Sequence, residues 1–200
     1  GGNYAFLSSF GSVDNVEPFA TALAYFSQKN PGIPVFKGGL PDTLPEAICC
    51  KRYDLITLFD VLEHIEEDEK SLQVLSPLLT AQGKILLTVP ACPFLYGVFD
   101  KNQQHFRRYT RSSLQQVIQR AGLSLHFISY WNFFLFPAMV LRRLSEKHAK
   151  NFSPEEEFAL PCFPLNQLAY SMLLLEKFLL PTVRFPIGGS LIALISKKGV

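Results

Sequence analysis

The stretch that decides the fold runs from Tyr53 to His64 and reads YDLITLFDVLEH. Its first seven residues are almost continuously apolar, which is typical of a strand covered on both faces of a parallel sheet. Three titratable side chains follow at once, Asp60, Glu63 and His64. Ligands of open α/β sheets bind beyond the carboxyl ends of the strands. A binding site is therefore expected directly after this strand.

Strands and helices alternate on both sides of this stretch. Apolar runs predict further strands at 84–90 and 123–130, each preceded by a helix. Thr110 is placed to cap the second of these helices and Gly122 to end it. A last strand at 190–196 is expected to run antiparallel, although periodicity alone does not decide its direction. The pattern predicts an α/β fold with a mostly parallel sheet and helices on both faces.

Two shorter strands are predicted before Tyr53. The first ends at Glu17, and Pro18 suits the first turn of the helix that follows. A carboxylate at a strand end can accept hydrogen bonds from both hydroxyls of a ribose. An acidic residue is also favoured at any helix N-terminus by the helix dipole, so both interpretations stay open.

Composition limits the classes of protein to which the chain can belong. It has 200 residues, of which 48% are hydrophobic and 18% charged, so intrinsic disorder is excluded as the main state. One domain, 1–200, is expected, with 133–186 as an apolar, mostly helical insertion or cap before the last strand. The net charge of +2 argues against a protein that coats nucleic acid.

The cysteines and the longest uncharged stretch bear on the compartment. The four cysteines form no C-x-x-C pair and no signal peptide is recognisable, so we expect reduced thiols and a cytoplasmic protein. The stretch 121–141 lacks Asp, Glu, Lys and Arg and is long enough to span a bilayer. Alternation of polar and apolar residues in it favours a strand followed by a buried helix, with peripheral membrane contact as the alternative.

A long loop, 91–109, follows the strand at 84–90 and leads into HFRRYT at 105–110. Long loops in compact domains often form lids or binding sites. The near-neutral pKa of histidine suits general-base work. The two arginines of this run can equally be solvated surface charges, and its tyrosine can equally be a packing residue. No metal site is expected, because His64 has no His or Cys partner at helical spacing.

Taken together, these motifs resemble the class I S-adenosylmethionine-dependent methyltransferases that act mostly on small molecules. DVLEHI at 60–65 resembles the "LEH" loop of that family, and AQGK at 81–84 its turn before the fifth strand. HFRRYT at 105–110, followed by AGL at 121–123, is similar to the family's "HxRxYT…AGF" run. The resemblance covers about 1–130 and implies a Rossmann-like methyltransferase fold.

The resemblance also implies S-adenosylmethionine as the cofactor, a small molecule as the methyl acceptor, and a set of site residues. The acidic residue that holds the cofactor ribose would be Glu17. The other cofactor-binding residues would be Gly1, Gly2, Pro18, Gly39, Leu40, Phe59, Asp60, Val61 and His64. The catalytic residues would be His64, His105 and Tyr109, and the acceptor would contact Tyr96, His105, Arg107, Arg108 and Tyr109. The apolar tail indicates a lipid-like or aromatic acceptor.

One departure keeps other hypotheses open. The chain begins at Gly1-Gly2, which resembles only the tail of the family's glycine-rich loop, so the first strand of the pattern is expected to be missing. A catalytically inactive interaction module is therefore a second hypothesis. A nicotinamide-dependent oxidoreductase is a third, since Glu17 would hold the ribose of NAD equally well, although no G-x-G-x-x-G is present. The oligomeric state is left open.

Overall fold

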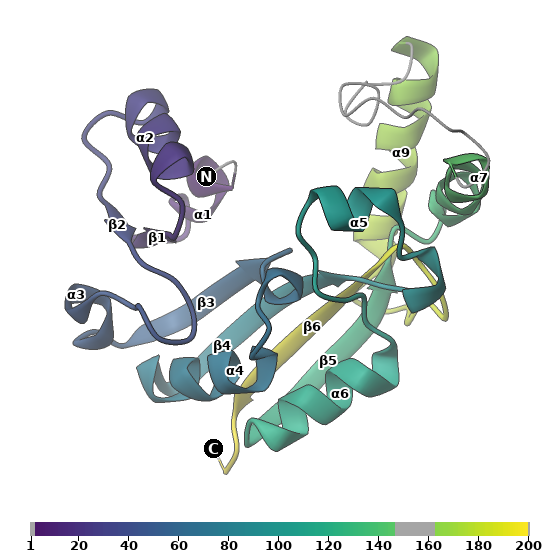
Figure 1. The fold of residues 1–200 in the computed structure, drawn as a ribbon. Coiled ribbons are helices and arrows are strands. Elements are labelled where there is room, and N and C mark those ends of the chain that lie inside the picture. Colours follow the sequence, from purple (N-terminus) through teal and green to yellow (C-terminus); the bar gives the residue numbers. More distant parts are fainter. Residues whose placement is uncertain (1–2, 147–162, 200) are drawn as a thin grey trace.

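The structure is a computed structural model that describes residues 3–146 and 163–199, so the expected cofactor residues Gly1 and Gly2 lie outside the described part. Its described strands form two sheets (Figure 1). The smaller sheet is a parallel pair, β1 (Asn15–Glu17) and β2 (Val35–Lys37). The larger has the order β3-β4-β6-β5, with bounds Tyr53–Phe59, Leu79–Pro90, Ser190–Lys197 and Leu123–Trp131 in that order.

Three strands of the larger sheet run the same way and β6 runs against them. β3 pairs parallel with β4, and β6 pairs antiparallel with both β4 and β5. The last strand of the chain enters the middle of the sheet, where Leu191, Ala193 and Ile195 are fully buried. The prediction of a mostly parallel Rossmann-like sheet with an antiparallel last strand is confirmed.

Helices α4 (Asp68–Leu75) and α6 (Arg111–Arg120) cover one face of the larger sheet (Figure 1). The Thr110 side chain caps α6 by accepting a hydrogen bond of 3.0 Å from the Ser113 N–H. Leu114 and Ile118 of α6 are fully buried, and Gly122 ends the helix with φ of 74°, a value that favours glycine. The predicted start and end of this helix are confirmed.

The remaining described elements are short helices or lie outside these layers. They are α1 (Tyr4–Leu7), α2 (Ala20–Lys29), α3 (Glu46–Cys49), α5 (Val98–Asn102), α7 (Phe136–Glu146), α9 (Phe163–Leu179), and the 3-10 turns η1 (Leu62–His64), η2 (Ser76–Leu78) and η3 (Pro93–Leu95).

One predicted boundary is wrong, and one expected loop contains helices. The strand expected at 84–90 begins earlier, at Leu79, which pairs with Tyr53 of β3, so a leucine that could continue the preceding helix lies in the sheet. Apolar residues next to a proline are locally compatible with a helix or with a strand, and the pairing with β3 decides for the strand. The stretch 91–109 is also more ordered than a loop, because it contains η3 and α5.

The described residues of the expected cap, 133–186, form α7 and α9, while residues 147–162 of it lie outside the described part. Both helices stand beyond the end of the larger sheet at which β6 begins (Figure 1). The Glu176 side chain of α9 accepts the N–H of Phe133 at 2.9 and 3.1 Å, which fixes α9 to the end of β5. None of the described helices combines the length and apolarity needed to cross a membrane.

Candidate active site

The site begins where β3 ends. Asp60 has φ of 51°, and its N–H donates to the carbonyl oxygen and the hydroxyl of Thr88 on β4, at 3.0 and 3.2 Å. The chain then turns through η1, whose Leu62 is fully buried. This tight turn holds Glu63 and His64 beside the carboxyl ends of both strands.

The stretch after β4 folds back onto the same edge. The Tyr109 N–H donates to the Pro90 carbonyl at 2.9 Å, and the Phe106 N–H donates to the Glu63 carbonyl at 2.8 Å. These bonds bring His105 against His64, with ring centroids 4.5 Å apart and ring planes at 84°. Two histidines that are far apart in the sequence thus form an edge-to-face pair.

Asp100 of α5 orients one of these histidines. Its carboxylate, which has no exposed area, accepts hydrogen bonds from Arg108 Nε at 2.7 Å, the Gly97 N–H at 2.9 Å and His105 Nδ1 at 3.0 Å. Burial raises the pKa of Asp100, but the bonds from Arg108 and Gly97 outweigh burial and hold it below its usual range. Because an ionised carboxylate only accepts, we assign the proton to His105 Nδ1, which leaves the Nε2 lone pair available.

A cavity of about 430 Å³ opens at this edge of the sheet, and we call it the histidine cavity. Its walls come from η1, the end of β4, the stretch after β4, α7 and the start of β6. The lining residues are Asp60, Glu63, His64, Pro90, Phe99, Gln103, His105, Arg108, Met139, Arg142, Arg143, Gly189 and Ser190. The cavity therefore combines titratable carboxyl and imidazole groups, apolar side chains, and positive charges contributed by α7.

Glu63 is the most unusual group of this cavity. It has 0% exposed area, and neither carboxylate oxygen has a hydrogen-bond partner among the described residues. Burial raises the pKa of Glu63 to about 8, so the carboxyl is mostly protonated at neutral pH. Burial, and next the positive charge of a protonated His105, lower the pKa of His64. Both effects favour the uncharged form of these side chains.

The structure places the expected cofactor residues in two groups. Glu17 ends β1 and Pro18 follows it. Both lie beside the Gly38-Gly39 turn after β2, and the Gly38 N–H donates to the Glu17 carbonyl at 3.2 Å. A Cβ at Gly39 would lie 3.2 Å from Pro18 Cβ, so this narrow turn suits glycine. One Glu17 oxygen accepts the Phe19 N–H at 3.2 Å, and within the described chain the other carries no hydrogen bond.

The second group continues from β3 towards the cavity. Phe59 ends β3, Asp60 and Val61 follow, and His64 closes η1. Leu40 and Val61 both pack against the main hydrophobic core. These residues provide an available carboxylate oxygen, a glycine turn and a partly apolar strand end. A cofactor that contains a nucleoside needs such surfaces, because its ribose has two hydroxyls and its base is flat and partly apolar.

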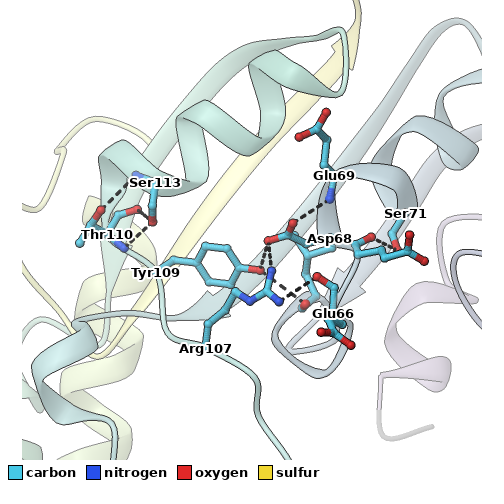
Figure 2. Close-up of polar contacts among 10 residues, drawn as sticks. Glu66, Asp68, Glu69, Ser71, Arg107, Tyr109, Thr110 and Ser113 are labelled. Atoms are coloured by element: carbon cyan, nitrogen blue, oxygen red, sulfur yellow. Dashed lines mark hydrogen bonds and ion pairs between the residues drawn. The ribbon is translucent and has the colours of Figure 1, made fainter.

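The expected catalytic and acceptor-binding residues separate in space. His64, His105 and Arg108 line the histidine cavity, whereas Arg107 and Tyr109 point to α4 (Figure 2). The Tyr109 hydroxyl donates to Asp68 Oδ2 at 2.9 Å, and Arg107 pairs with the same carboxylate at 2.8 Å. Tyr109 is buried and its geometry is that of a packing and anchoring residue.

Tyr96 is bonded to the backbone of this protein, because its hydroxyl donates to the His105 carbonyl at 2.7 Å. Sequence reasoning missed Asp100, whose position five residues before a histidine was the available signal. It also missed Arg142 and Arg143, because charged side chains near the end of an expected helix are usually solvated. Only the packing of α7 over the strand ends brings these two side chains to the cavity.

Comparison with known proteins agrees with this geometry. The family model described as "Methyltransferase domain" matches residues 9–126, more than half of the chain. No curated protein sequence matches the chain significantly. The solved structures similar to it include a TehB-like SAM-dependent methyltransferase from Corynebacterium glutamicum, with 19% identity and a TM-score of 0.52 over 96% of this chain and 72% of that one.

Two further structures hold the cofactor or its product. The O-methyltransferase of the trans-AT PKS multienzyme of Brevibacillus brevis, in complex with S-adenosyl-L-homocysteine, has 17% identity and a TM-score of 0.54 over 96% of this chain and 61% of that one. The glycopeptide N-methyltransferase MtfA, complexed with S-adenosyl-L-methionine, has 10% identity and a TM-score of 0.56 over 98% of this chain and 76% of that one. By its family match and this shared fold, the chain belongs to the methyltransferase-domain family and has the class I, S-adenosylmethionine-dependent methyltransferase fold.

Proposed function

We propose that this protein transfers the methyl group of S-adenosylmethionine to a small acceptor bound in the histidine cavity. One observation carries the proposal. Asp60 and His64 belong both to the strand end expected to bind the cofactor and to the lining of the cavity. An acceptor in the cavity would therefore lie next to the methyl group, and holding two reactants in line is the main contribution of such an enzyme.

The residues after β1, β2 and β3 would hold the cofactor, which supplies an activated methyl group on a sulfonium. Glu17 would accept hydrogen bonds from the ribose hydroxyls, since a carboxylate offers two acceptor oxygens to a diol. Gly39 and Leu40 would face the adenine, and Phe59, Asp60 and Val61 would line the cleft between the ribose and the cavity.

His105 is the best-placed general base for a hydroxyl acceptor. Asp100 fixes its Nδ1 proton, so Nε2 can take the proton of the acceptor while the new oxygen–carbon bond forms and the carbon–sulfur bond breaks. The buried carboxylate also stabilises the imidazolium that results. His64 packs against His105 and is a second candidate for the same proton.

The walls of the cavity favour an acceptor with a polar reacting end and an apolar body. Phe99, Met139 and Pro90 supply apolar surface, while Arg108 and the α7 arginines supply positive charge. We propose that α7 and α9 form a cap over a lipid-like or aromatic acceptor. Phe163 and Phe178 of α9 are 81% and 77% exposed, which is consistent with peripheral contact with a lipid surface.

A small molecule is a better acceptor for this protein than a nucleic acid, because the net charge of +2 provides little attraction for a phosphate backbone. The thiols of Cys49, Cys50 and Cys92 are free, in keeping with the cytoplasmic location that we propose.

Calorimetric titration with S-adenosylhomocysteine tests the cofactor assignment. Binding in the micromolar range is expected for the full natural protein, with a clear loss of affinity in Glu17→Gln. His64→Ala and His105→Gln should slow turnover more than they weaken cofactor binding, and His126→Gln on β5 is the matched control. A folded protein that does not bind S-adenosylhomocysteine would overturn the proposal.

A further inference from the structure

Glu63, His64 and His105 form a cluster that the sequence did not predict. Each offers one ligand atom, and all three atoms lie within 4.8 Å of one another. A second ligand at helical spacing is the sign by which a sequence can show a metal site, and His64 has no such partner in the sequence. The partner is instead His105, brought in by the hydrogen bonds between the stretch after β4 and η1.

We propose that these three side chains bind a divalent transition-metal ion of the zinc type. A set of two imidazoles and one carboxylate, with open positions facing a cavity, is a recurrent donor set for such ions. Atoms about 2.1 Å from a common ion at tetrahedral angles are separated by about 3.4 Å. The cluster therefore needs only a modest closing movement, for which the exposed His64 ring has room.

The surroundings of the ligand atoms support this site independently. His105 Nδ1 donates a hydrogen bond of 3.0 Å to the buried Asp100 carboxylate. Metal-binding histidines usually direct their second nitrogen to a carboxylate or a backbone carbonyl in this way. The Nδ1 atom of His105 is thereby fixed, and its Nε2 atom is left for an ion.

Glu63 is a further independent observation. Its side chain has 0% exposed area, lines the cavity, and has two oxygens without hydrogen-bond partners in the described chain. Buried polar atoms almost always have a partner, and a cation would supply one. Asp60 lines the same cavity, and the Arg108 charge beside the site is paired with Asp100 at 2.7 Å.

The site shares the cavity of the proposed methyl acceptor, but metal binding does not depend on methyl transfer. If both occur, the histidine lone pairs would be used by the ion and could not take the acceptor proton. A bound cation would instead lower the pKa of a hydroxyl acceptor, so that its proton would be lost to water before the methyl group is transferred. The acceptor would then be a group that also binds metal, such as a phenol or an enol next to a second oxygen.

The experiment is titration of the protein, freed of any histidine tag and stripped with a chelator, with Zn²⁺ in a calorimeter. Binding of one equivalent is expected, with Mg²⁺ binding at least about 100-fold more weakly because imidazole nitrogen favours the softer ion. Titration with Co²⁺ should give visible absorption bands that report nitrogen ligation.

Two variants test proposed ligands, a third tests the residue that orients His105, and a fourth is a control; circular dichroism checks that each is folded. His64→Ala and Glu63→Gln should weaken zinc binding at least about 100-fold, and Asp100→Asn about 10- to 100-fold, the usual effect of losing a residue that orients a ligand. His126→Gln, a change on β5 away from the cavity, should leave it unaltered. The exposed His64 gives the variant least prone to misfold.

Two results would overturn the inference: no zinc binding by the folded protein, or an affinity unchanged in both His64→Ala and Glu63→Gln. S-adenosylhomocysteine titration of the same samples keeps the two proposals apart. Cofactor binding without zinc binding removes the metal site alone, whereas zinc binding without cofactor binding removes the proposed methyl transfer.

Discussion

Replacing Arg108 by Met tests how the stretch after β4 is held in place. Arg108 Nε donates to Asp100 at 2.7 Å, and one terminal nitrogen donates to the Ala91 carbonyl at 3.2 Å. The side chains of Arg108 and Asp100 are 4% and 0% exposed, so the substitution leaves a carboxylate buried without its main partner.

The expected loss of stability follows from these contacts. Removing one partner of a buried ion pair costs about 3–5 kcal/mol. Asp100 keeps the donors of Gly97 and His105, so we expect the lower end, about 3 kcal/mol. For a protein of this size that corresponds to a fall of about 6–12 °C in melting temperature. Adding Asp100→Asn removes the stranded charge, so the double variant should be no less stable than Arg108→Met.

Urea unfolding followed by the fluorescence of Trp131, the one tryptophan of the chain, measures these differences. The pKa of Asp100 is held below its usual range, so the stability that this pairing provides is present above the unfolded-state pKa of about 3.8. It is lost as the pH falls through the lower folded-state pKa, and the wild type and Arg108→Met should converge there. A loss below about 1 kcal/mol at pH 7 would refute the reasoning.

Three further outcomes are expected. Tyr109→Phe removes one buried hydrogen bond and should cost about 1–1.5 kcal/mol in urea unfolding while turnover changes little; a large loss of turnover without a loss of stability would instead make the hydroxyl catalytic. Gly188→Ala would put a Cβ 2.3 Å from the Trp131 carbonyl oxygen, a backbone clash that should lower the melting temperature by several degrees in a thermal scan. Burial raises the pKa of Glu176, so the folded state binds more protons than the unfolded one and stability falls as the pH rises above about 4.5. Glu176→Gln keeps an acceptor for the Phe133 N–H, so its stability relative to the wild type should rise as the pH increases above about 4.5; an unchanged difference would contradict the raised pKa.

The sequence by itself determined the parts of the fold whose signals are local. The strand at 53–59 has the predicted bounds because a continuous apolar run of this length fits a buried strand. The helix after Thr110 begins and ends as predicted, because a capping hydroxyl and a glycine with positive φ act within one turn of the helix. The positions of Asp60 and His64 at the edge of the sheet where the cavity opens followed from the same strand.

The tertiary structure alone decided how distant segments meet. Three features depend on the fold-back of 91–109: the pairing of His64 with His105, the hydrogen bond from His105 to Asp100, and the burial of Glu63 without a hydrogen-bond partner among the described residues. Tyr109 ends that stretch and its sequence context is that of a site residue, yet it is anchored to α4. Periodicity reports which face of an element is apolar. It carries no information on which other element covers that face, because that choice depends on packing between segments far apart in the chain.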